Sequence, residues 1–137
     1  RTRAVTGSHN GELKCWDLES PECLQTLQAH RGRVNAIQAD LVHMKALTGS
    51  EDFTLKSWDL NTGACIRSLS TDGGVLSLSA DFSAMKAVCG LDTSKLQFWD
   101  LATGELLANL EADAAGWLLY ALRVHCVVAD FAEMMAV

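Results

Sequence analysis

The sequence lacks any apolar run long enough to cross a membrane. The longest uncharged apolar stretch, "AAGWLLYAL" at 114–122, has nine residues, whereas a spanning helix needs about 20. The chain opens "RTRAV" with no apolar segment behind this basic start, so no secretory signal is seen. We therefore expect an intracellular protein, in the cytoplasm or nucleus, without a membrane partner.

Basic residues are too few and too scattered for a nucleic-acid surface. The chain has 11 Lys and Arg against 17 Asp and Glu, and its net charge is −6. Binding to a nucleic-acid backbone needs a clustered basic face, so we expect no nucleic-acid partner. The five cysteines form no CxxC pair. We interpret them as small apolar strand residues in a reducing compartment, rather than as disulfide partners or metal ligands.

Motifs for catalysis are missing as well. Gly73-Gly74 is not followed by the Lys-Ser/Thr pair of a phosphate-binding loop. The four histidines show no i, i+4 pairing, which leaves a zinc site without support. The acidic residues are dispersed, and no pair stands out as an acid/base couple. We therefore expect no catalytic residues, no cofactor and no metal.

The sequence does contain a strong internal repeat. "GSHNGELKCWDL" at 7–18 returns as "GSEDFTLKSWDL" at 49–60 and as "GLDTSKLQFWDL" at 90–101. A second segment, "ADLVHMKAL" at 39–47, returns at 80–88 and at 129–137. The repeat signature is Trp16-Asp17, Trp58-Asp59 and Trp99-Asp100, with spacings of 58 − 16 = 42 and 99 − 58 = 41. Such a period indicates an array of similar structural units.

Each unit reads as short strands. The second unit holds four strand candidates at 33–39, 44–49, 54–60 and 64–69, separated by turn residues. The connections are too short for crossover helices, so neighbouring strands must pair antiparallel. A single four-stranded sheet of this length leaves both faces apolar and must stack on its neighbours. The sequence therefore predicts an all-β array of stacked sheets.

These features resemble the WD40-repeat β-propeller family. The marks are the Trp-Asp pairs, the period, and His30 in "LQAHRGRV". The resemblance implies a partial WD40-type β-propeller of four-stranded antiparallel blades. It places the end of a blade at 1–27, complete blades at 28–69 and 70–110, and the start of a blade at 111–137, with an insertion near 114–122. Closing a ring takes about four to eight blades, so we expect a fragment of a longer, about seven-bladed propeller.

The resemblance also implies a buried polar network in the second unit, formed by His30, Thr48, Asp52 and Trp58. In it the carboxylate accepts from the imidazole, which bonds the threonine, whose hydroxyl meets the indole N–H. A Ser/Thr-His-Asp set can also suggest a hydrolase triad. No oxyanion-hole motif accompanies it, and the family uses this set to hold a blade together, so we expect a structural role.

The other two units depart from this pattern. In the first unit Asn10 stands where the second has Asp52, and the His position lies before the chain begins. In the third, Thr71 replaces the His and Thr93 replaces the Asp. We expect the network to be lost in the third unit.

Partners of WD40 proteins are usually held on the narrow top face of the ring. By resemblance, this face is formed by His9, Glu51 and Asp92 in turns and by Arg31, Arg33 and Asp72 at strand starts. Such a mixed-charge rim orients a peptide, although each charge adds little affinity. An equally open alternative is that these residues are merely solvated. We expect no aromatic anchor among them. In the insertion, Trp117 and Tyr120 either dock a partner or pack on the last blade.

The resemblance therefore implies a non-catalytic scaffold that binds other proteins or peptides in an intracellular complex. The alternative is that the array is a targeting or regulatory appendage of a larger enzyme, such as a signalling ATPase or kinase. Two further readings stay open. One is a partial propeller that self-associates through its open blade edges, and the other is a decayed segment without function.

Overall fold

The computed structural model describes residues 2–111, which form strands and turns without a helix. The strands are β1 (Arg3–Gly7), β2 (Glu12–Asp17), β3 (Glu22–Gln28), β4 (Val34–Asp40), β5 (Lys45–Ser50), β6 (Thr54–Asp59), β7 (Ala64–Ser70), β8 (Val75–Asp81), β9 (Lys86–Leu91), β10 (Lys95–Asp100) and β11 (Glu105–Glu111). Within this part of the chain, no helix has the length and apolarity that a membrane crossing requires.

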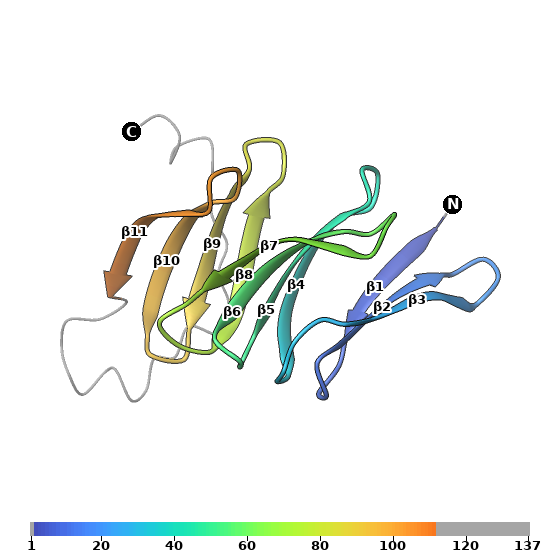
Figure 1. The fold of residues 1–137 in the computed structure, drawn as a ribbon, viewed down its shortest axis with the longest axis horizontal. Helices are drawn as coiled ribbons and strands as arrows, with labels where there is room; N and C mark the ends of the chain where they lie inside the picture. Colours follow the sequence, from blue (N-terminus) through green and yellow to red (C-terminus); the bar gives the residue numbers. More distant parts are fainter. Residues whose placement is uncertain (1, 112–137) are drawn as a thin grey trace.

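The strands form three antiparallel sheets that stand side by side (Figure 1). The first sheet has the order β1-β2-β3, the second β4-β5-β6-β7 and the third β8-β9-β10-β11. The four strands predicted for the second unit agree with β4–β7 to within one residue at each end. The all-β prediction of stacked, four-stranded antiparallel blades is confirmed. The insertion near 114–122, with Trp117 and Tyr120, lies outside the described residues.

Every sheet carries the same irregularity next to its signature Trp. The register between the last two strands of each sheet shifts directly before this residue, at Cys15/Trp16, Ser57/Trp58 and Phe98/Trp99. A bulge of this kind strengthens the local twist and re-aims the side chain that follows it. The repeated sequence thus sets each Trp in the same way, and Trp58 and Trp99 are both buried.

The second sheet buries both of its faces. Successive side chains of a strand point to opposite faces, so the adjacent residues Ala46 and Leu47 of β5 enter different cores. Ala46 packs with Leu13 of the first sheet, whereas Leu47 packs with Val75 of the third. Fully burying a leucine contributes roughly 1.5–3 kcal/mol. Stacking on both sides therefore supplies the stability that a single sheet lacks.

A glycine lets the second and third sheets approach closely. A Cβ at Gly49 of β5 would lie 2.3 Å from Val75 Cγ1 at the start of β8. The first and second sheets use the same device, since a Cβ at Gly7 would lie 2.6 Å from Val34 Cγ1. The Gly-Val pairing thus sets the distance between neighbouring blades.

A polar side chain on the outer strand joins each blade to the next. Arg67 of β7 donates through Nη2 to Ala102 O (2.8 Å) and through Nη1 to Thr103 O (3.1 Å), both in the β10–β11 turn. Gln25 occupies the same position in β3, and with its amide oriented to match the surrounding donors and acceptors its nitrogen donates to Leu60 O (3.0 Å). The shorter glutamine thus replaces a guanidinium at the junction of the first two blades.

Candidate functional site

All six predicted partner-binding residues lie at one end of the sheets. This end is formed by the turns β1–β2, β5–β6 and β9–β10 and by the connections β3–β4 and β7–β8, at the lower edge of Figure 1. We call it the His30 end. It carries His9, Arg31, Arg33, Glu51, Asp72 and Asp92, all of them exposed.

Two of these residues also fasten a turn to the connection that leads into the same sheet. Glu51 Oε1 accepts from Arg33 N at 3.0 Å, and Glu51 N donates to Arg33 O at 3.1 Å. In the third sheet, Asp92 Oδ1 accepts from Gly74 N at 3.0 Å, and Asp92 N donates to Gly74 O at 2.9 Å. These carboxylates therefore hold the loops as well as facing solvent.

The remaining predicted residues differ in how firmly they are held. Asp72 Oδ2 lies 3.6 Å from Lys95 Nζ and accepts from Asn109 Nδ2 at 2.9 Å. The side chains of His9, Arg31 and Arg33 are exposed, and Arg31 is fixed through its backbone N–H, which donates to Asp52 Oδ2 at 2.9 Å. The two arginines thus present exposed cationic side chains on a backbone held by hydrogen bonds to Asp52 and Glu51.

An aromatic side chain that the sequence analysis did not include also lies at this end, since Phe53 in the β5–β6 turn has 51% of its surface exposed. Its φ is 69°, and the corresponding residues of the other turns also have positive φ, Gly11 at 87° and Ser94 at 64°. This conformation costs an L-residue with a bulky side chain roughly 1–2 kcal/mol. Stability alone does not explain a phenylalanine here. The repeat alignment could have indicated this positive φ, since Phe53 stands where the first unit has Gly11.

The structure brings the four predicted network residues together beneath this face. His30 is buried, with Nε2 at 2.7 Å from Thr48 Oγ1 and Nδ1 at 3.1 Å from Asp52 Oδ2. Trp58 Nε1 donates to Thr48 Oγ1 at 2.9 Å. Thr54, which the sequence analysis did not include, joins them with Oγ1 at 2.9 Å from His30 Nδ1.

One protonation state satisfies the whole network. A neutral imidazole with its proton on Nδ1 donates to Asp52, and its Nε2 accepts from the Thr48 hydroxyl, whose oxygen accepts from the indole. A hydrolase nucleophile must reach its substrate, but Thr48 has no exposed surface. This Thr-His-Asp set is therefore built as an internal brace. Within residues 2–111, no group of three or more His, Cys, Asp and Glu side chains could hold a metal ion.

Burial sets the charge state of the brace. It lowers the pKa of His30, against the raising effect of the Asp52 carboxylate. Burial alone would raise the pKa of Asp52, but hydrogen bonds from the Thr54 hydroxyl and the Arg31 N–H outweigh it, so the pKa of this carboxyl is lowered. At neutral pH the network therefore pairs a neutral imidazole with a carboxylate.

We expect the stability of this blade to fall as the pH drops below 6.5, the ordinary pKa of histidine. Between that value and the lower folded pKa of His30, the unfolded chain binds more protons than the folded one, so acid favours unfolding. Urea unfolding at several pH values on both sides of 6.5 measures the slope. His30→Gln should flatten it, whereas His43→Gln, at an exposed site, should not. An unchanged slope in His30→Gln would contradict this account.

The first unit keeps one part of the network. Trp16 Nε1 donates to Thr6 Oγ1 at 2.9 Å, which reproduces the Trp58–Thr48 bond. Asn10, in the place of Asp52, bonds instead to Ser8 Oγ through its side-chain oxygen. The turn is therefore closed locally, without a histidine.

The third unit lacks the hydrogen bond from the Trp indole as well as the His and Asp of the network. Thr71 Oγ1 bonds to Gly73 O at 2.8 Å, within its own loop. Cys89 replaces Thr48, and Trp99 Nε1 is buried without a hydrogen-bond partner among residues 2–111. Burial raises the pKa of the Cys89 thiol to about 12, so it stays protonated, and its sulfur is a weak acceptor. The indole N–H has therefore lost the oxygen that receives it in the other units.

A comparison with protein-family models finds a match that includes most of the second unit. Residues 21–59 match the model of the WD domain, G-beta repeat, a range that runs from the start of β3 to the end of β6 and includes the His30 network. The chain therefore contains a WD40 repeat at residues 21–59, and its three antiparallel sheets are consistent with WD40 blades. Such domains are generally non-catalytic and typically bind other proteins. No curated protein matches this chain.

Proposed function

We propose that this protein is a non-catalytic WD40 scaffold that binds a protein or peptide segment through its His30 end, in an intracellular complex. The observation that supports this most is Phe53, an aromatic side chain half exposed at an unfavourable backbone conformation. Strain of this kind is a reason to infer a functional constraint.

The residues around Phe53 suit a peptide partner. Binding hot spots are rich in aromatic residues and arginine, and Arg31 and Arg33 lie on the connection tied to the Phe53 turn by Glu51 and Asp52. The His30 brace fixes this turn from below, so little ordering cost remains when a partner binds. The surrounding charges orient the partner more than they hold it.

The same face serves both versions of this function. A free-standing scaffold and a targeting or regulatory region of a larger enzyme, such as a signalling ATPase or kinase, would each use an exposed anchor on a rigid end. The contact chemistry proposed for Phe53 is then the same, and only the remainder of the protein differs.

Phe53→Gly is expected to separate stability from binding. Glycine tolerates the positive φ, so the free energy of unfolding should rise by about 1 kcal/mol. Partner affinity should fall about tenfold or more, because an anchor is removed. Urea unfolding measures the first effect, and quantitative mass spectrometry of captured proteins measures the second.

Val42→Gly is the matched control, since Val42 is an apolar residue 87% exposed in the β4–β5 turn at the opposite end. Its capture profile should equal that of the wild type. Charge reversal at Glu51 is a weaker test of partner binding, because the Glu51 carboxylate also accepts a hydrogen bond from Arg33 N. Arg33→Glu tests the charge at this end more cleanly, since it keeps the backbone N–H that makes this bond. Equal capture by the wild type and Phe53→Gly would exclude Phe53 from the site.

A further inference from the structure

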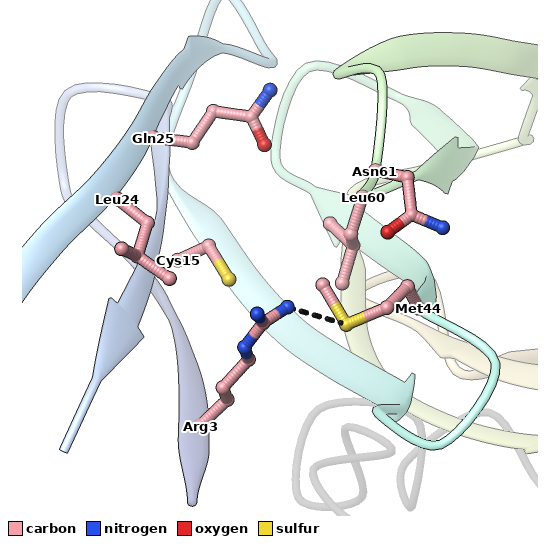
Figure 2. A pocket seen from close by; sticks show the side chains of 7 residues that line it. All are labelled: Arg3, Cys15, Leu24, Gln25, Met44, Leu60 and Asn61. Atoms are coloured by element: carbon pink, nitrogen blue, oxygen red, sulfur yellow. Dashed lines mark hydrogen bonds between the residues drawn. The ribbon is translucent and has the colours of Figure 1, made fainter. Parts of the chain in front are cut away.

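A pocket of about 330 Å³ opens between the first and second sheets, at the end opposite the His30 end. It is lined by Arg3, Cys15, Leu24, Gln25, Met44, Leu60 and Asn61. In Figure 2, Arg3 extends from β1 into the space between the two sheets, toward Met44 on the far side. No residue of the lining carries a carboxylate.

Among residues 2–111, the guanidinium of Arg3 has no oxygen acceptor. Its Nη1 donates to Met44 Sδ at 3.2 Å, and its buried Nε has no hydrogen-bond partner among residues 2–111. A thioether is a weak acceptor, whereas a guanidinium is always charged and offers five N–H donors. The pocket thus presents a cation that is only partly satisfied by the protein.

Of the two lysines at the corresponding place in the next blades, Lys86 has an oxygen partner, whereas Lys45 has none among residues 2–111. Lys86 starts β9 as Arg3 starts β1, and its Nζ lies 3.2 Å from Asp100 Oδ2. At the next blade junction, the Arg67 guanidinium bonds two backbone carbonyls. Arg3 stands opposite Asp17 in the β1–β2 register, but its guanidinium is turned to Met44. The first junction therefore differs from the second in its polar chemistry.

The rest of the lining indicates what such a cation would bind. Leu24 and Leu60 provide apolar walls, and Gln25 and Asn61 provide amides at the side of the pocket. A volume of this size suits a small ligand group, and a guanidinium pairs in a bidentate manner with a carboxylate. A ligand that matches both features has one carboxylate and a short apolar stem.

We propose that this pocket binds a carboxylate carried on a short aliphatic chain, with the carboxylate on Arg3 and the chain against Leu24 and Leu60. Binding moves the donors of Arg3 from the Met44 sulfur to the carboxylate oxygens. The carboxylate belongs either to a free small molecule or to a glutamate side chain of a peptide. This site is separate from the His30 end and does not depend on the function proposed for it.

The Met44 methyl group reports on this event directly. With ¹³C-methyl methionine in the protein, a titration with hexanoate should shift the Met44 resonance in a saturable way. Met85 occupies the equivalent position in the third sheet, and its methyl resonance should not shift. Hexanol, which has the chain without the charge, should bind about tenfold to one-hundredfold more weakly.

Arg3→Met should abolish the shift, and Lys14→Met, which removes one positive charge from the same sheet, should retain it. Arg3→Lys keeps a cation and should bind detectably but more weakly, so a folding defect in Arg3→Met leaves the test intact. A capped Ala-Ala-Glu-Ala-Ala peptide and its Gln counterpart form the second arm. A response to hexanoate alone assigns a free ligand, and a response to the Glu peptide assigns a side chain. No saturable Met44 shift with either probe, or equal affinity for hexanol, would overturn the proposal.

Discussion

His30→Ala is expected to lower the free energy of unfolding by about 2–4 kcal/mol, through the loss of a buried hydrogen-bond network. The substitution removes a side chain that joins Thr48 to Asp52 within the second blade. It leaves the Thr48 hydroxyl proton without its imidazole acceptor and removes one of the two donors to Asp52 Oδ2, so that only the Arg31 N–H still bonds this oxygen. Because the second blade is packed on both faces, this loss weakens the two junctions as well.

Urea or thermal unfolding of the protein measures this effect. His43→Ala is the control, because His43 is also bonded to an aspartate, with Nδ1 2.7 Å from Asp40 Oδ2, but its side chain is 72% exposed. An exposed pair of this kind contributes less than about 1 kcal/mol. Equal losses in the two variants would mean that the buried network contributes no more than a surface pair.

Gly11→Ala is expected to have a comparable effect, a loss of about 3 kcal/mol. Gly11 has a φ of 87°, and a Cβ added there would lie 2.1 Å from the backbone O of His30. The positive φ costs roughly 1–2 kcal/mol, and the collision with a backbone atom adds about as much again. The carbonyl of Gly11 also accepts from Ala29 N and His30 N, so a shift at Gly11 displaces the loop that carries His30.

Gly104→Ala separates the cost of the positive φ from the cost of the collision with a backbone atom. Gly104 has a similar φ of 78°, but an added Cβ would first meet the end of the Arg67 side chain, at 2.6 Å from Nη1, which can move. We expect a loss of about 1–2 kcal/mol there from the positive φ, and a smaller one from any shift of the Arg67 guanidinium away from Ala102 O and Thr103 O. If unfolding curves gave the same loss for both variants, the close contact between Gly11 and His30 would not govern the first blade junction.

The repeat explains why much of this fold could be predicted. Strands of fixed length and alternating burial recur at a fixed period, so β4–β7 follow from the second unit almost residue by residue. The His30 network could be predicted because the resemblance to WD40 repeats implies it at fixed positions relative to Trp58. A periodic pattern specifies the backbone, and these side chains are short enough for the backbone to position them.

Features that depend on one side chain's direction could not be predicted in this way. The exposure of Phe53 follows from the sign of one φ angle, which the polarity of the sequence does not report. The dual role of Glu51 depends on which backbone N–H comes within its reach. Arg3 has a long side chain with several rotatable bonds, and its turn toward Met44 is set by the neighbouring blade rather than by its own strand. Such tertiary contacts decide the chemistry of both ends.

The central claim is that partners bind at the His30 end, and site-specific photocrosslinking in cells tests it most directly. A photoreactive phenylalanine analogue is placed at position 53 in one protein and at position 42 in another. Both sites are exposed, and they lie at opposite ends of the blades. We predict covalent adducts with partner proteins from position 53 and none from position 42. Adducts from position 42 alone would contradict the account and place the partner at the other end.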